Sequence, residues 1–333
     1  MKLNPQTKHI EMLKNLHPRF RYAAGSDFAA WQKSARARLN ELLGLPLETC
    51  APDVRIEWQK DMGAYTETRF LFASEPGVDV LCHLLLPKSE EKVPLVICLQ
   101  GHSKGMHISL GRPKFPGDEE SIAGGDRDFA RQIIARGQAA LAIEQRCFGE
   151  RGGTPEGPAC YQTAVQALLL GRTLLGERCW DISRAIDVIE TDFPMIDTAK
   201  IAVMGNSGGG TASIYAAALD ERIAAALPSC AFCGYLPSIG AQYHCSCNYV
   251  PGIARDFDMG DLAGLIAPRP MVIVNGLQDK IFPVDSAREQ FVIAQQLYTA
   301  AGATDLLRHV IGPEGHRFYA DAAWPVFDEI TGW

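Results

Sequence analysis

The sequence predicts an α/β fold, a mostly parallel and doubly wound sheet with helices on both faces. Two observations favour this class. Apolar runs of strand length alternate with helical stretches from about residue 93 to residue 330, with no linker, repeat or low-complexity tract between them. Residues 54–87 alternate in a pattern typical of antiparallel strands, which would open the same sheet. We therefore expect one domain at 54–333 behind a helical arm at 1–53.

The composition is that of a globular protein with a large core. Of the 333 residues, 47% are hydrophobic, and the formal net charge of −7 disfavours a nucleic-acid partner. Residues 1–20 contain no apolar stretch of the kind found in export signals, and no window of the sequence is long enough to cross a bilayer. These observations predict a cytoplasmic protein without a membrane partner.

The N-terminal arm is expected to be helical. Asp27 stands where it could cap a helix that begins at Phe28. The arm would pack either on the domain or on a partner subunit, so a homo-oligomer stays open.

The most informative motif is G-N-S-G-G at 205–209. It lies between the apolar run 201–204 and a helical stretch of small residues at 211–219. A serine at the apex of a sharp strand-to-helix turn needs small residues two positions before and two after it, because strand and helix pass close together there. Gly205 and Gly209 meet that requirement, which predicts a nucleophile elbow.

A Gly-rich turn can also serve as a phosphate cradle or as a packing joint. The dinucleotide-binding spacing fails, because Ser213 stands where its third glycine should be, and no G-x-x-x-x-G-K-[ST] loop occurs. The elbow with Ser207 as nucleophile is therefore the preferred interpretation.

A serine hydroxyl becomes a good nucleophile when an imidazole takes its proton and a carboxylate orients that imidazole. The β-rich run 270–274 ends shortly before Asp279, and the run 306–311 ends shortly before His316. Both residues would then lie in loops at the carboxyl ends of strands, where open α/β sheets place their chemistry. We predict Asp279 as the acid and His316 as the base of Ser207.

Other candidates fit these roles less well. Asp285 follows a proline and is expected to cap the next helix. His309 falls inside a strand pattern, and three further histidines occur in loops that could border the site without the expected strand-loop setting. These three are His102, His107 and His244.

An acyl-transfer site also needs backbone amides aimed at the developing oxyanion. The residue after the nucleophile, Gly208, supplies one. The loop that follows the buried strand pattern at 93–99 should supply the second, and we assign it to the amide of His102. The His102 side chain is expected to make an ordinary loop contact.

With these residues assembled, the chain resembles the α/β-hydrolase superfamily from about residue 54 to its end. The order Ser, Asp, His is the order of that superfamily. The closer likeness is to the acetyl xylan esterase, dienelactone hydrolase and prolyl oligopeptidase-like branch, and it rests on the stretches 100–102, 144–150 and 266–270. Two residues depart from the branch pattern, since Gln100 stands in place of a histidine and Cys147 in place of a glycine.

The resemblance implies a serine esterase that removes a small acyl group, expected to be acetyl, from a small-molecule or oligosaccharide ester without a cofactor. Arg146, in the loop after strand 139–143, would either contact substrate or form a buried salt bridge. A lactone or peptide hydrolase of the same fold is the alternative. A non-catalytic binding protein is a third reading, which the presence of all three triad candidates disfavours.

Two insertions, near 102–131 and 231–261, are expected to frame the site, because loops of this length inside a compact domain are usually functional. The first is rich in glycine, proline and charged residues. The second carries four aromatic residues that would form either a pocket wall or the core of a lid helix: Phe232, Tyr235, Tyr243 and Tyr249.

Four of the ten cysteines occur close together in the sequence, Cys230 directly before the second insertion and Cys233, Cys245 and Cys247 within it. They have the residue types of a zinc site or of disulfides. The spacing disfavours one tetrahedral metal, and the absence of an export signal disfavours disulfides. We expect buried packing residues near the active site and no metal.

Overall fold

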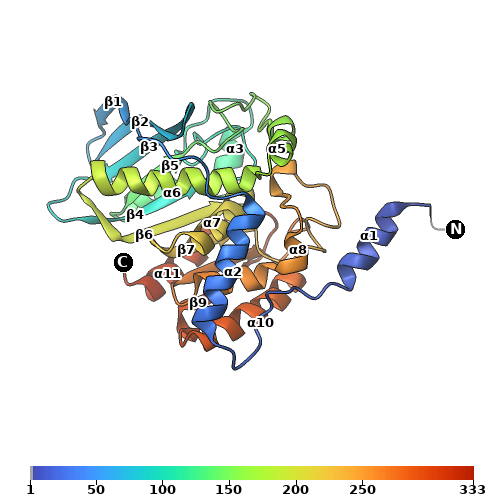
Figure 1. Ribbon diagram of the computed structural model, residues 1–333. Coiled ribbons are helices and arrows are strands. Elements are labelled where there is room, and N and C mark those ends of the chain that lie inside the picture. The colour runs from blue at the N-terminus through green and yellow to red at the C-terminus, as the bar shows by residue number, and fades with distance from the viewer. Residues whose placement is uncertain (1–2) are drawn as a thin grey trace.

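Figure 1 shows the computed structural model, which describes residues 3–333. Its centre is a nine-stranded sheet in the order β1-β2-β3-β5-β4-β6-β7-β8-β9. The first three strands pair antiparallel: β1 (Arg55–Asp61), β2 (Tyr65–Glu75) and β3 (Val78–Pro87). The others pair parallel among themselves: β4 (Val93–Leu99), β5 (Ala139–Ile143), β6 (Ile196–Asn206), β7 (Ile223–Ser229), β8 (Met271–Gly276) and β9 (Leu307–Gly312).

Helices cover both faces of this sheet, which confirms the predicted fold class (Figure 1). Helices α2, α6, α7, α9 and α10 pack on one face, and α4 and α11 pack on the other. The helices are α1 (Pro5–Lys14), α2 (Phe28–Leu43), α3 (Asp118–Ala123), α4 (Phe129–Ala135), α5 (Cys160–Leu169), α6 (Leu174–Asp192), α7 (Gly208–Leu219), α8 (Ile253–Asp256), α9 (Met259–Ile266), α10 (Val284–Ala300) and α11 (Ala320–Thr331), with the 3₁₀ turns η1 (Ser246–Asn248) and η2 (Thr304–Leu306).

The central strand β4 divides the core in two, because successive side chains of a strand point to opposite faces. Leu95, Ile97 and Leu99 are buried in the larger cluster, under α6 and α7. Val96 and Cys98 are buried in the smaller cluster, under α4 and α11. A strand buried on both faces reads as a continuous apolar run, as this one does in the sequence.

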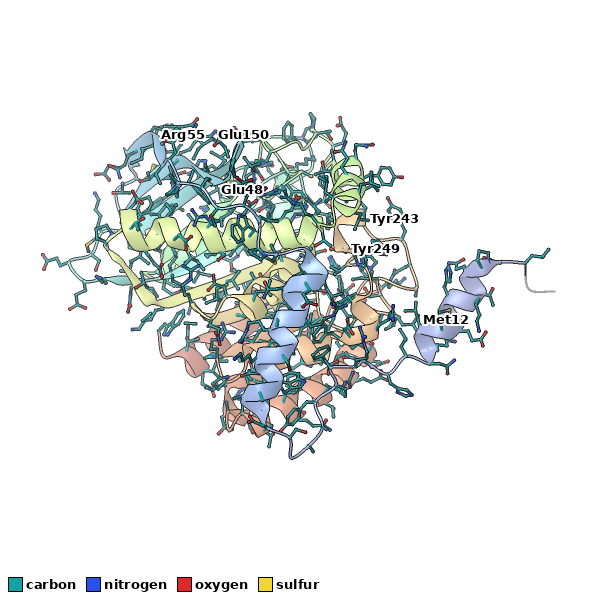
Figure 2. All side chains as sticks on the ribbon, in the orientation of Figure 1. Met12, Glu48, Arg55, Glu150, Tyr243 and Tyr249 are labelled. Atoms are coloured by element: carbon teal, nitrogen blue, oxygen red, sulfur yellow. The ribbon has the colours of Figure 1, made fainter. Side chains whose placement is uncertain are left out.

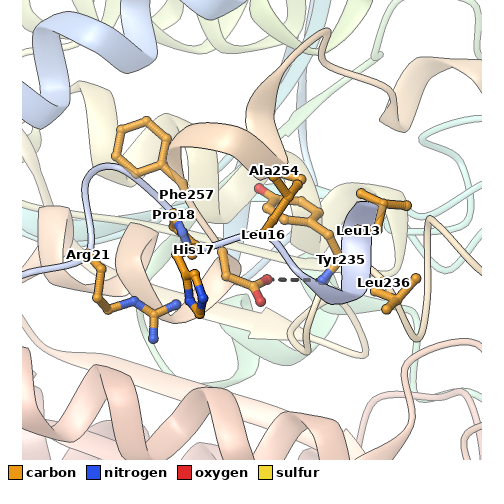
Figure 3. Close-up of a pocket in the computed structure, with 10 residues that line it drawn as sticks. Leu13, Leu16, His17, Pro18, Arg21, Tyr235, Leu236, Ala254 and Phe257 are labelled. Carbon is orange, nitrogen blue, oxygen red and sulfur yellow. Dashed lines mark hydrogen bonds between the residues drawn. The ribbon is translucent and has the colours of Figure 1, made fainter. Parts of the chain in front are cut away.

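The N-terminal arm joins the domain mainly through α2. Asp27 caps this helix, accepting a hydrogen bond from the amide of Ala30 at 3.0 Å, as the sequence predicted. Ala35, Leu39 and Leu43 are fully buried in the larger core. Helix α1 buries no residue, and its Leu13 lines a pocket together with Tyr235 and Leu236 of the second insertion (Figures 1 and 3).

The segment after α1 is tied to the second insertion. It forms one wall of a pocket of about 320 Å³, with Tyr235 and Phe257 on the opposite side (Figure 3). Arg19 pairs with Asp256, and Arg21 pairs with Asp261 at 2.8 Å. The arm therefore packs on its own domain, and contact with a second subunit stays a prediction.

Within residues 3–333, no helix combines the length and the apolarity needed to cross a membrane.

Candidate active site

Ser207 occupies the turn between β6 and α7, at the carboxyl edge of the sheet. Its backbone has φ 57° and ψ −123°, a sparsely populated conformation for a residue with a side chain. Two hydrogen bonds of 2.8 Å fix the turn, one from the Ser207 amide to the carbonyl of Ser229 and one from the amide of Thr211 to the Ser207 carbonyl. This is the elbow geometry that the motif predicted.

The two glycines of the motif are required by close backbone contacts. A Cβ at Gly205 would lie 2.4 Å from the carbonyl carbon of Gly209, and one at Gly209 would lie 2.0 Å from the carbonyl oxygen of Leu99. The start of α7 therefore touches both β6 and β4. Any side chain at either position would push the helix off the sheet and displace Ser207.

Asp279 and His316 form a pair in the loops after β8 and β9. His316 Nδ1 lies 2.8 Å from Asp279 Oδ2, and the other carboxylate oxygen accepts hydrogen bonds from the amides of Ile281 at 2.8 Å and Phe282 at 3.1 Å. Burial alone would raise the pKa of Asp279, but the hydrogen bonds from His316 and these amides outweigh it and hold the pKa below its usual range. The carboxylate is thus charged and fixes the imidazole through Nδ1, while His316 Nε2 has no hydrogen-bond partner within residues 3–333.

Ser207 and His316 line the same small cavity. No hydrogen bond joins the serine hydroxyl to His316 among the residues that the structure describes. Such bonds are often long in unliganded enzymes and tighten when substrate binds.

The competing residues have other partners. His309 lies in β9 and contacts Asn275 at 3.0 Å, and His107 contacts Asp118 at 2.9 Å. The expectation that Asp285 caps a helix was wrong, because α10 begins at Val284 with Pro283 at the cap position. Asp285 instead pairs with Arg288 on the surface.

The loop after β4 passes directly over the elbow. A Cβ at Gly101 would lie 2.8 Å from the carbonyl oxygen of Asn206 and 3.1 Å from Ser207 Cβ. Across residues 3–333, neither the His102 amide nor the Gly208 amide donates a backbone hydrogen bond. The oxyanion role predicted for these two amides stays a prediction, and their lack of a backbone acceptor is compatible with it.

Glu144, directly after β5, braces this loop, and the sequence reasoning missed its role. Its carboxyl group accepts hydrogen bonds of 2.9 Å from the Gln100 side-chain amide and from the Met106 backbone amide. The neighbouring Gln145 side chain donates to the Gln100 carbonyl at 2.6 Å. The signal that could have found it is its position, a buried polar residue at the carboxyl end of a parallel strand.

Burial raises the pKa of Glu144 to about 7. A raised carboxyl pKa stabilises the folded protein fully only below the pKa of the unfolded chain, near 4.5, and this contribution is lost as pH rises through 7. Between pH 4.5 and 8, the free energy of unfolding should fall by about 3 kcal/mol more in the wild type than in Glu144→Gln. Urea unfolding across this range measures the difference, and parallel stability curves would contradict the assignment.

Arg146 forms the buried salt bridge that was one of its two expected roles. Its guanidinium contacts Asp181 at 2.8 and 2.9 Å, Glu177 at 3.0 Å and Glu75 at 2.8 Å. Asp181 also pairs with Arg151 at 2.8 Å. This network joins β2 to α6 behind the loop that follows β5. Arg146 lines none of the cavities that contain Ser207.

Removing one partner from a buried ion network leaves charges without compensation. Arg146→Met should therefore lower the free energy of unfolding by about 3–5 kcal/mol. Arg308→Met is the matched control, because Arg308 pairs with Glu329 on the surface at 3.5 Å, and it should cost less than about 1 kcal/mol. If both substitutions lowered the free energy of unfolding equally in denaturant titrations, the buried network would stabilise the protein no more than a surface ion pair does.

Two cavities of very different size meet at Ser207. The smaller has a volume of about 60 Å³ and is lined by Ile108, Arg127 and Phe129. The larger is a cleft of about 870 Å³ between α5 and the second insertion. Of the lining residues, Ser207 and His102 are common to both cavities.

The aromatic residues of the second insertion divide between core and cleft. Phe232 and Tyr235 are buried, as expected for core residues rather than for a pocket wall. Tyr243 is 98% exposed and Tyr249 is 43% exposed, and both line the cleft beside α5 (Figure 2). Tyr161, the second residue of α5, is also exposed at this cleft.

The four cysteines in and directly before the second insertion do not form one cluster. Cys230 lies with Asp279 and His316, and its thiol donates to the Arg317 carbonyl at 3.2 Å. Cys233 is buried in the larger core. The grouping by sequence proximity was wrong, because the chain runs from β7 across the site before it reaches Cys245 and Cys247.

Comparison with known proteins gives consistent likenesses. A family model described as fungal glucuronyl esterase matches residues 173–234. The chain is 28% identical over 241 residues, 70% of its own length and 77% of the other's, to YtaP of Bacillus subtilis (strain 168), provisionally named a hydrolase. It is 30% identical over 165 residues to the 4-O-methyl-glucuronoyl methylesterase of Hypocrea jecorina (strain QM6a), where the match spans 41% of this chain and 35% of the fungal one.

Among solved structures, a protein from Bacteroides fragilis provisionally named an acetyl xylan esterase superposes with a TM-score of 0.77 at 18% identity, covering 99% of this chain and 90% of the other. A glucuronoyl esterase from Solibacter usitatus gives a TM-score of 0.72 at 16% identity, covering 95% and 98%.

The sheet order and these likenesses show that the chain has the α/β-hydrolase fold. The proteins that it resembles are acetyl xylan esterases and glucuronoyl esterases, which agrees with the esterase side of the predicted resemblance.

Proposed function

We propose that the protein is a carbohydrate esterase that removes an acetyl group from an oligosaccharide by a Ser-His-Asp mechanism. The observation that carries the proposal is the division of space around Ser207, a pocket of about 60 Å³ on one side and an open cleft of about 870 Å³ on the other. An ester with a small acyl group and a large alcohol fits this asymmetry. The expected cytoplasmic location stays part of the proposal.

The chemistry follows from the positions of three side chains. Ser207 attacks the ester carbonyl while His316 Nε2 takes its proton, and Asp279 stabilises the imidazolium through Nδ1. The amides of Gly208 and His102 bind the oxyanion. His316 then protonates the departing sugar oxygen, and water releases acetate from the acyl-enzyme by the same steps.

The small pocket suits an acetyl group. Its volume of about 60 Å³ leaves room for roughly two to four water-sized groups. Ile108 and Phe129 provide apolar contacts for a methyl group and close the pocket, since both are buried. A longer acyl chain would require these residues to move.

The large cleft suits a sugar. Exposed aromatic rings offer flat apolar faces on which the C–H groups of a pyranose can stack, while the surrounding polar groups bind hydroxyls. Tyr161, Tyr243 and Tyr249 are placed in this way along the cleft.

A glucuronoyl ester is the second candidate. The fungal family model and the Hypocrea jecorina relative support it. Arg127 also lines the small pocket, and its Nε has no hydrogen-bond partner within residues 3–333, so it could contact the carboxyl group of a uronic acid. A uronic acyl group is much larger than acetyl, which is why we place it second.

Ser207→Ala should reduce kcat for ester hydrolysis by at least about 10³-fold while the melting temperature stays the same, because the turn is held by its backbone and its glycines. Ser34→Ala, on the exposed side of α2, is the matched control and should keep full activity. Steady-state kinetics on p-nitrophenyl acetate measure both. Activity in the Ser207 variant close to that of the wild type would refute its role as nucleophile.

Acyl-chain selectivity tests the pocket. Each misplaced methylene changes discrimination by roughly 1–3 kcal/mol, so acetate should exceed octanoate more than tenfold in kcat/KM. Ile108→Ala enlarges the pocket and should reduce the difference in kcat/KM between acetate and butyrate esters.

Acetylated xylo-oligosaccharides and the methyl ester of glucuronic acid, assayed side by side, separate the two substrate candidates. Equal turnover of octanoate, or faster turnover of the glucuronate, would move the assignment away from acetyl.

A further inference from the structure

Four potential metal ligands meet beside the active site. They come from three separate segments of the chain: His102 from the loop after β4, Cys160 from the first turn of α5, and Cys245 and Cys247 from the second insertion around η1. One ligand atom from each lies within 4.8 Å of all the others. His102 Nε2 is 3.0 Å from Cys247 Sγ, which is 3.4 Å from Cys245 Sγ.

The spacing of these atoms suits a tetrahedral metal. Zinc–sulfur bonds of about 2.3 Å and zinc–nitrogen bonds of about 2.0–2.1 Å place neighbouring ligand atoms roughly 3.5–3.8 Å apart. The observed separations of 3.0 Å, 3.4 Å and up to 4.8 Å lie on both sides of those values, so small side-chain rotations would form the site. A site with three thiols and one imidazole binds zinc in preference to harder divalent cations such as Mg²⁺ or Ca²⁺.

The charge balance around the cluster supports the same conclusion. Arg178 is buried, and its Nη2 lies 3.3 Å from Cys160 Sγ. Of the salt bridges in residues 3–333, none involves Arg178, so its positive charge has no carboxylate partner. Burying an uncompensated charge is strongly unfavourable. Three thiolates, a neutral imidazole and Zn²⁺ together carry one negative charge, which would neutralise this guanidinium.

We propose that His102, Cys160, Cys245 and Cys247 bind one zinc ion. This departs from the expectation of no metal, which considered only the cysteines that are close in sequence. Four protein ligands complete a tetrahedral site, so the ion is structural and takes no part in the ester chemistry. It joins α5, the second insertion and the loop of His102, the segments that form the cleft and carry one oxyanion amide.

The ring of His102 connects the metal site to the elbow. It lies against Gly208, where a Cβ would be 2.5 Å from the imidazole. Metal binding would fix this ring and, with it, the backbone of His102. Loss of the metal should therefore make the cleft more mobile while Ser207, Asp279 and His316 keep their positions.

The test uses the full chain, purified without chelators and analysed for metal by plasma mass spectrometry. Wild type and Cys50→Ala, a cysteine on the N-terminal side of β1, should each carry about one equivalent of zinc. The double variant Cys245→Ala with Cys247→Ala should carry less than about a tenth of that. An unchanged zinc content in the double variant would refute the site.

A second measurement does not depend on folding of the variants. Wild-type protein stripped with a chelator under reducing conditions is titrated with Co²⁺, which reports its ligands in its absorption spectrum. The proposal predicts thiolate-to-cobalt charge transfer, tetrahedral d–d bands and saturation at one equivalent. Absence of thiolate bands, or a disulfide found by peptide mapping between the cluster cysteines of freshly purified protein, would overturn it.

Discussion

The site depends on one close approach, the contact of the first turn of α7 with the ends of β4 and β6. Because a Cβ at Gly209 would lie 2.0 Å from the Leu99 carbonyl, this contact exists only with glycine. It forces Ser207 into its φ of 57° and presents the hydroxyl above the sheet. The same contact lays the loop of Gly101 over the serine, so one packing constraint places both the proposed nucleophile and the amides proposed to bind its oxyanion.

The remaining parts of the site are held at the carboxyl edge of the sheet by buried polar groups. Glu144 braces the loop after β4 through Gln100. Arg146 joins the loop after β5 to α6 through Asp181. Each of these groups is costly to bury alone and is satisfied by its partners. The loops are thereby fixed on the side of the small cavity at Ser207, whereas exposed tyrosines and the cysteine cluster lie on the side of the large cleft.

The sequence was sufficient for the fold and for the residues that obey local rules. Glycine spacing located the turn of Ser207, and the places of Asp279 and His316 after strands located a pair that the structure brings together, while their catalytic roles stay predictions. Groups assembled by tertiary contacts could not be found in this way. Cys160 and Cys245 are 85 positions apart in the chain yet meet at one point, while Cys230 and Cys245 are near in sequence and lie apart. The spacing of residues within a short stretch of sequence carries no information about such long-range contacts.

The central claim is that Ser207 carries the acyl group of a sugar ester. The most direct measurement mixes the wild-type protein with an acetylated xylo-oligosaccharide, stops the reaction with acid within milliseconds and maps the peptides by mass spectrometry. The account predicts one acetyl group, on the peptide that contains Ser207, appearing before free acetate reaches its steady rate. Acetate release without any acyl-enzyme, or an acetyl group on another residue, would contradict it.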